Sequence, residues 1–485
     1  MFSHPVTQCG TPSSCAFWLL AILLIAAFIL GGSARGDVQS LIILRPLAAV
    51  MLGVGLWKLK FEHFRRNKFL AAMMLAILAL PMIQLIPLPY AMWSHFSGRQ
   101  LVVEIDLVAG LGQIARPISL APDATLNSLL SLLVPSAVFV LGVQLDKAAL
   151  DRLLPVLLGL AGVSALIGLV QTLDMPNGPL YFYDITNPGS AVGLFANRNH
   201  QALLLAMALP MLGVWASEHD RVGPVRKVGA IVGVLALLPL ILITGSRAGA
   251  ISGLLALLSI FLIVPRRSPN QPGASLRGRP WNVQAIAARA GAIALVSGLI
   301  ALTVLLGRAE AWDRFQSIFR DDDLRFRILP TLAGMFLKYW PLGTGIGSFE
   351  KIFQANEPDE LLGPVYMNHA HNDWLELPLT GGLPGACLLL VSIAATAASI
   401  SRNFRRTTPS AQPDPFARLG LIVILLAGFA SLSDYPLRTP SLASVFVVAV
   451  LWASCPLSRY GAWTGPSENQ SDQDRNESKK RQHAQ

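Results

Sequence analysis

Residues 228–264 read VGAIVGVLALLPLILITGSRAGAISGLLALLSIFLIV: two apolar runs, 228–244 and 248–264, on either side of a short turn that contains Arg247. Such runs are typical of membrane-spanning helices, because crossing the roughly 30 Å hydrocarbon core of a bilayer takes about 20 apolar residues. Of the 485 residues, 53% are hydrophobic and only 14% are charged, whereas average soluble domains carry roughly 25% charged residues. The sequence therefore predicts an all-α, polytopic bundle of transmembrane helices.

About twelve apolar segments set the expected topology. They lie at about 16–32, 40–57, 69–89, 125–145, 153–172, 199–216, 228–244, 248–264, 290–307, 380–399, 419–432 and 441–456. We expect transmembrane helices 1–9 within residues 1–307 and one large periplasmic loop with short helices at 308–380. Helices 10–12 are expected within 381–456, followed by a disordered, polar cytoplasmic tail at 457–485.

The charges of the short loops predict the orientation. With the N-terminus in the cytoplasm, Lys and Arg accumulate in the loops on the cytoplasmic side, in agreement with the positive-inside rule. The loop 308–380 then lies on the opposite side of the membrane. The same distribution accounts for the formal net charge of +10 without a nucleic-acid partner. We expect the first apolar run to be a retained helix, because it lacks the positively charged segment that precedes the apolar region of a cleaved signal peptide.

Arginines at the outer ends of spans are candidates for binding an anion. Arg247 lies in a turn of small residues, where its planar guanidinium can hold phosphate oxygens; the alternative is an arginine that extends to the membrane surface. Asn197 and Arg198 open the sixth span, and a helix N-terminus favours an anion, although Asn197 can also simply cap the helix. Arg45 lies inside the second span, and its partner is not evident from the sequence.

The acidic run at 321–323 permits two interpretations. Three consecutive aspartates could bind a divalent metal, but acidic residues also favour the start of a helix. Pro330 suits the first turn of such a helix. Apolar residues at helical spacing from Leu332 to Tyr339 then predict a short helix at the membrane interface. We favour the helix over the metal site.

The glycines Gly343, Gly345 and Gly347 suggest a phosphate-binding loop, but no strand precedes them. We interpret them as a turn that returns the chain to the membrane. The four cysteines show neither disulfide nor metal spacing and are interpreted as small apolar side chains.

The densest polar cluster is His369-Ala370-His371-Asn372-Asp373. His369, His371 and Asp373 at alternate positions could bind a metal, or all of these residues could be ordinary surface groups. In the third interpretation, one histidine is a general base oriented by Asn372 or Asp373, because an imidazole can take a proton from a sugar hydroxyl near neutral pH. We favour this third interpretation.

The order and spacing of these motifs resemble the O-antigen ligase and O-antigen polymerase family of bacterial envelope polysaccharide proteins. The similarity covers about 193–390, and the N-terminal half matches only in its helix pattern. The matching features are Asn197-Arg198-Asn199-His200, Ser246-Arg247-Ala248-Gly249, Trp340-Pro341-Leu342-Gly343-Thr344-Gly345, His369-Ala370-His371-Asn372-Asp373-Trp374-Leu375-Glu376 and Gly381-Gly382-Leu383-Pro384-Gly385.

The resemblance implies a metal-independent, inverting glycosyltransferase of the bacterial inner membrane, with a periplasmic active face and no cofactor. The donor would be a glycan on undecaprenyl diphosphate, and the acceptor a hydroxyl of a glycan, lipid or protein. His371 would be the base, with His369 as the alternative. Arg247 would bind the diphosphate together with Arg325 or, in the other register, Arg327.

Two other functions are compatible with a polytopic membrane protein. A transporter or flippase for lipid-linked sugars is typically built from inverted repeats with ionisable groups near the bilayer midplane. Here the charged candidates gather at one surface, and no repeat is evident. A receptor or scaffold that binds the lipid-linked donor without chemistry is the third possibility.

Overall fold

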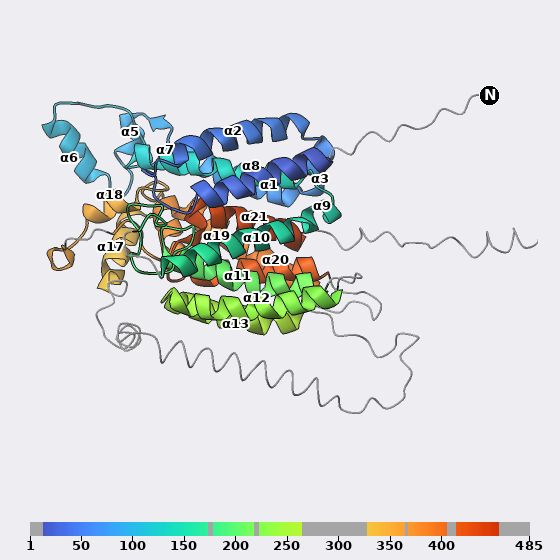
Figure 1. Ribbon diagram of the computed structural model, residues 1–485. Coiled ribbons are helices and arrows are strands. Elements are labelled where there is room, and N and C mark those ends of the chain that lie inside the picture. The colour runs from blue at the N-terminus through green and yellow to red at the C-terminus, as the bar shows by residue number, and fades with distance from the viewer. Residues whose placement is uncertain are drawn as a thin grey trace, which may run out of the picture.

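The computed structural model describes residues 13–172, 178–217, 223–263, 327–363, 367–404 and 414–454. These residues form a bundle of long helices with shorter elements covering one of its ends (Figure 1). The only sheet among them is a two-stranded antiparallel ribbon, in which Pro87 pairs with Pro117 and Leu88 with Arg116. The described chain is therefore almost entirely helical, as the sequence predicts.

The elements follow one another along the chain in this order: α1 (Ser13–Leu30), α2 (Leu41–Lys58), α3 (Phe61–Arg66), α4 (Lys68–Gln84), β1 (Pro87–Leu88), α5 (Tyr90–Trp93), α6 (Gln100–Val108), β2 (Arg116–Pro117), α7 (Pro122–Ser131), α8 (Leu133–Gly142), α9 (Lys147–Asp151), α10 (Leu153–Gln171), α11 (Arg198–Ser217), α12 (Gly223–Ile243), α13 (Arg247–Ile263), α17 (Leu329–Tyr339), α18 (Phe349–Gln354), η2 (Asp359–Leu361), α19 (Asp373–Phe404), α20 (Pro415–Ala430), η3 (Pro436–Arg438) and α21 (Pro440–Ser454).

Six helical stretches among the described residues are long and apolar enough to cross a membrane, by length and composition. They are α2, α7 with α8, α9 with α10, α11, α12 and α19. Five shorter apolar helices accompany them: α1, α4, α13, α20 and α21. Each predicted apolar segment within the described ranges coincides with one of these helices. The predicted span at 290–307 lies outside the described residues, so the total of about twelve spans stays a prediction.

The start of α19 differs from the expected start of the tenth span. The sequence predicted an apolar segment from about residue 380, but the helix already begins at Asp373. Asn372 explains the earlier start, because its side-chain oxygen accepts hydrogen bonds from the backbone N–H groups of Trp374 and Leu375 at 3.0 and 3.3 Å. The helix is interrupted at Gly382, whose φ of 61° lies in the left-handed region that favours glycine.

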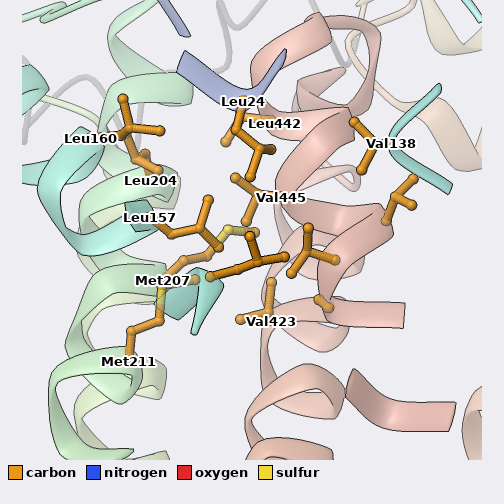
Figure 2. Packing of buried hydrophobic residues seen from close by; sticks show 14 of the residues in the cluster. Leu24, Val138, Leu157, Leu160, Leu204, Met207, Met211, Val423, Leu442 and Val445 are labelled. Atoms are coloured by element: carbon orange, nitrogen blue, oxygen red, sulfur yellow. The ribbon is translucent and has the colours of Figure 1, made fainter. Parts of the chain in front are cut away.

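The hydrophobic core takes side chains from most of the long helices, and Figure 2 shows part of it. Its labelled members are Leu24 of α1, Val138 of α8, Leu157 and Leu160 of α10, Leu204, Met207 and Met211 of α11, Val423 of α20, and Leu442 and Val445 of α21. Helix α11 is the most enclosed of the six candidate spans, since 72% of its span residues are buried and no other candidate exceeds 44%. Residues at the start of α11 consequently lie near the middle of the bundle.

One end of the bundle, which we call the cap end, gathers chain segments that are distant in sequence. Helices α11, α13, α19 and α21 begin there, and α1, α10, α12 and α20 end there (Figure 1). Backbone hydrogen bonds join these ends: Ser441 N–H donates to the Gly31 carbonyl at 3.2 Å, and Asp373 N–H donates to the Ser431 carbonyl at 3.0 Å. The two histidines of the predicted site precede α19 at this end.

The cap end is covered by α17, α18 and the glycine-containing turn. A second hydrophobic cluster packs α17 and α18 against Met367 and Ala370, the segment that carries His369 and His371. The predicted helix at Leu332–Tyr339 is thus confirmed as part of α17. Gly343, Gly345 and Gly347 all have positive φ, and Gly345 N–H donates to the Thr380 carbonyl beside the break in α19, so their interpretation as a turn is also confirmed.

A small residue is required where α20 crosses α21. A Cβ at Gly420 would lie 2.3 Å from the Ala449 carbonyl oxygen and 2.8 Å from the Ala453 nitrogen, and neither backbone atom can move aside cheaply. We expect Gly420→Val to destabilise the protein by about 1–3 kcal/mol or more, as overpacking does. A lowered midpoint of thermal unfolding in detergent would show this.

The control is Gly159→Ala on α10, where an added Cβ meets nothing within 4 Å. It should leave the midpoint unchanged or raise it, because alanine favours a helix by roughly 1 kcal/mol over glycine. Equal midpoints for the wild type and Gly420→Val would show that α20 and α21 do not cross this closely.

Candidate functional site

Asp434 is the centre of a buried polar cluster at the cap end. It lies in the connection between α20 and α21, and its side chain is 3% exposed. Asn197 and Asn199, at the start of α11, donate their side-chain N–H groups to Oδ2 at 3.0 and 2.7 Å, and Tyr435 N–H donates to Oδ1 at 2.9 Å. Because a buried carboxylate is costly without donors, these bonds stabilise the ionised form and join α11 to this connection.

Two imidazoles face the same carboxylate. His371 Nδ1 lies 3.6 Å and His200 Nε2 3.9 Å from Asp434 Oδ1, too long for hydrogen bonds but close enough for charge interaction. The His200 side chain is 2% exposed, and both of its ring nitrogens are buried without a hydrogen-bond partner. The His371 side chain is 23% exposed, so His371 is the accessible imidazole of the pair.

The backbone at His371 is unusual. Its φ of 50° makes it the one residue other than glycine with a positive φ in the described ranges. The segment is held on both sides, because Ala370 N–H donates to Glu376 Oε2 at 2.8 Å and Asp373 N–H donates to the Ser431 carbonyl at 3.0 Å. Such backbone outliers persist only where the surroundings fix them, and they concentrate at functional sites.

A second charged network surrounds Arg438, which follows Asp434 in the same connection. Arg438 Nε donates to Asp373 Oδ1 at 3.0 Å, and its Nη2 lies 2.9 Å from Glu376 Oε1. His369 Nδ1 shares that Glu376 oxygen at 3.1 Å. The Glu376 side chain is 1% exposed, so the guanidinium supplies the charge that allows this carboxylate to be buried.

The ring of Tyr435 lies between the two networks. Its centroid is 4.3 Å from that of His369, 5.0 Å from that of His371 and 5.6 Å from that of His200. Asn368 Nδ2 donates to its hydroxyl at 3.3 Å. Burial, reinforced by the negative charge of Asp434, raises the pKa of Tyr435 to about 12, so the phenol keeps its proton at physiological pH.

The environment keeps Asp434 ionised. Burial alone would raise the pKa of this carboxyl group, but the facing imidazoles of His371 and His200 and the Asn199 amide lower the pKa by more. The net pKa lies well below the usual range of an aspartate. A permanent negative charge beside His371 can stabilise the imidazolium that forms when this histidine takes a proton, as the aspartate of a catalytic triad does.

The predicted supporting residues have different partners from those expected. Asn372 caps α19, and Asp373 binds Arg438, so neither holds a histidine by a direct hydrogen bond. The groups facing His369 and His371 are instead Glu376 and Asp434. Asn197 caps the start of α11, since its Oδ1 accepts from Asn199 N–H at 2.8 Å, and its Nδ2 donates to Asp434. Its role in binding an anionic ligand stays a prediction.

The alternative of a metal site on 369–373 gains no support from these contacts. The side chains of His369, His371 and Asp373 face three different partners. No group of three His, Cys, Asp or Glu side chains that could hold a metal ion occurs among the residues that the structure describes.

The predicted anion-binding arginines fall in three places. Arg198 lies in the first turn of α11, and its backbone N–H donates to Asn187 Oδ1 at 3.0 Å. Arg247 begins α13, whose first turn packs against that of α11, because a Cβ at Gly249 would lie 2.2 Å from the Ala202 Cβ. Arg327 is exposed near the start of α17 and donates to the Glu360 carbonyl at 3.0 Å. Arg325, like the acidic run at 321–323, lies outside the described residues.

Sequence reasoning did not identify Asp434, Tyr435 and Arg438 as site residues. They lie in one short connection between two apolar helices, about 60 residues after the histidines. The sequence contained one indication of a site here: an acidic and a basic side chain lie within five residues of each other. Their connection is predicted to lie on the same side of the membrane as the histidines. The sequence does not predict that this connection contacts the start of α11, because the contact results from the packing of the helices.

The fold and the cluster together define a class of protein: a polytopic helical membrane protein with a buried histidine–carboxylate site at one end of its bundle. A family model described as O-antigen ligase matches residues 231–390, about a third of the chain. This family implies a glycosyl-transfer enzyme in general. A comparison with curated proteins finds no match.

The matched range contains both histidines, Arg247, Glu376 and the two candidate arginines before α17. It starts at residue 231 rather than at the expected 193, and it ends at 390 as expected. Asn197 and Asp434 lie outside it, on either side. The structure therefore joins the matched segment to helices before and after it through the polar cluster.

The network around Arg438 leads to a stability prediction. Arg438→Met removes the cation between Asp373 and Glu376, and loss of one partner of a buried pair typically costs about 3–5 kcal/mol. We expect a strongly lowered midpoint of thermal unfolding for the protein in detergent. Arg438→Lys, which keeps the charge, should lose less.

A double variant separates the ionic effect from the loss of packing. Arg438→Met with Glu376→Gln no longer buries an unpaired carboxylate at position 376, and should regain part of the lost stability. A double variant that is as unstable as the sum of both single changes would contradict the ionic explanation.

Proposed function

We propose that the protein is a glycosyltransferase that moves a glycan from undecaprenyl diphosphate to an acceptor hydroxyl at the periplasmic face of the bacterial inner membrane. The reaction is metal-independent and inverts the anomeric centre. The observation that carries the proposal is the partly exposed His371 facing the buried, ionised Asp434. The match to the O-antigen ligase family model supports the reaction class.

In this mechanism His371 is the general base. Its Nδ1 faces Asp434, which favours a proton on that nitrogen and leaves Nε2 as the acceptor for the hydroxyl proton. The acceptor oxygen then attacks the anomeric carbon from the face opposite the diphosphate, the glycosidic C–O bond to the diphosphate breaks, and the configuration inverts. Asp434 stabilises the resulting imidazolium, and apo distances such as the 3.6 Å here can shorten once substrate is bound.

The lipid diphosphate is the leaving group of this reaction, and the site needs positive charge to stabilise it. Negative charge grows on the lipid diphosphate as the bond breaks, and guanidinium groups placed beforehand stabilise it. Arg247 and Arg198 are our choices at the cap end, because the helices that they begin pack against each other there. Arg325 or Arg327 would supply a further contact from the segment that precedes α17.

The acceptor is a hydroxyl of a second glycan, of a lipid or of a protein. The envelope glycans of a strain that lacks the protein distinguish these cases. Shortened chains indicate a polymerase, and an intact but unattached polymer indicates a ligase.

Replacement of the base is the direct test. His371→Ala should abolish glycan transfer from the lipid-linked donor while the protein accumulates normally in the membrane, because no group remains to accept the hydroxyl proton. Transfer by the wild-type protein should persist in excess chelator. His95→Ala, an exposed histidine on the connection between α5 and α6, is the control and should be fully active. Full activity of His371→Ala would refute the assignment.

Asp434 is predicted to be a positioning residue for His371. Asp434→Asn keeps the size of the side chain but removes its charge, and we expect kcat to fall on the order of 10²-fold or more with little change in KM. Asp184→Asn, an exposed aspartate in the connection between α10 and α11, serves as the control. An increase in KM alone would assign Asp434 to substrate binding, against this prediction.

A further inference from the structure

A cavity outside the polar cluster lies at the cap end, where the α1–α2 connection meets the start of α2. Its volume is about 360 Å³. Its lining residues are Gly36, Asp37, Val38, Gln39, Leu41, Ile42, Arg45 and Pro46. None of these residues takes part in the site described above, so the cavity is a separate feature of the same end of the bundle.

Arg45 is the cationic side chain that lines this cavity, and it has no ionic partner among the residues that the structure describes. Its Nη2 donates to Asn127 Oδ1 at 2.6 Å, and its Nε is buried without a hydrogen-bond partner. No carboxylate lies within ion-pair distance of Arg45 in the described parts of the chain. A guanidinium within a membrane span is costly unless an anion or water compensates its charge.

The walls of the cavity are apolar on one side and charged at the mouth. Leu41, Ile42 and Pro46 belong to α2, and Ile42 is 75% exposed on the helix face that continues into the span. At the mouth, Asp37 accepts from Arg35 Nη2 at 2.6 Å, so its negative charge is compensated. Arg45 therefore gives the cavity a net positive charge directly beside a surface suited to acyl chains.

We propose that this cavity binds the phosphate group of a membrane lipid, with Arg45 as its counter-ion and the exposed apolar face of α2 along its hydrocarbon chain. A guanidinium donates charge-assisted hydrogen bonds to phosphate oxygens, and Arg45 lines the cavity with no carboxylate neutralising it among the described residues. The phosphate can belong to a bilayer phospholipid or to a polyprenyl carrier. The site does not depend on the proposed transfer reaction.

The test measures lipid binding to the purified full-length protein in detergent by native mass spectrometry. The probes are phosphatidylglycerol, undecaprenyl phosphate and, as a lipid without phosphate, diacylglycerol. We expect Arg45→Gln to weaken binding of at least one phosphate lipid about tenfold, the loss of one charge-assisted contact. Diacylglycerol should be unaffected. Arg65→Gln, an exposed arginine on α3, is the matched control and should bind like the wild type.

A second variant keeps the proposal testable if Arg45→Gln does not fold. Val38→Trp leaves Arg45 in place and fills the cavity, so it should weaken the same lipid by a similar factor. Weaker binding of undecaprenyl phosphate alone assigns the site to the polyprenyl carrier. Equally weakened binding of both phosphate lipids assigns it to bilayer phospholipids. Wild-type affinities for both phosphate lipids in a folded Arg45→Gln or Val38→Trp protein would overturn the proposal.

Discussion

A carboxylate removed from water must find its donors inside the protein, and Asp434 finds them on segments that are far apart in the chain. Asn197 and Asn199 reach it from the start of α11, and His371 faces it from the segment before α19. The cost of leaving such a group unsatisfied exceeds that of most single contacts. The helix ends at the cap end are therefore held in one arrangement by electrostatics as well as by packing.

The same arrangement brings several of the chain's few charged side chains together at one place in the bundle. The apolar helices meet through close packing of small and aliphatic side chains, as expected for a bundle in lipid. Charged groups collect where α20 turns into α21, and each buried one has a partner of opposite charge or several donors. Arg438 is the clearest case, because it binds two carboxylates of α19. This connection therefore joins α20 to α21 and also carries the charged residues of the candidate site.

Two cationic environments at the cap end contrast with each other. Arg438 has two carboxylates as partners, so its charge is used within the fold. Arg45 has only the Asn127 side chain and backbone carbonyl as described partners, so its charge is available to a ligand.

The sequence by itself determined the all-α membrane architecture, the approximate positions of the long helices within the described residues and the glycine turn, and it singled out His369 and His371 as candidates. These features follow from local properties: apolar run length, backbone freedom and residue type. Only the tertiary structure decided which carboxylates face the histidines. Asp434 is 63 positions from His371 and 237 from Asn197. Partners at such separations are selected by helix packing, which no local pattern records.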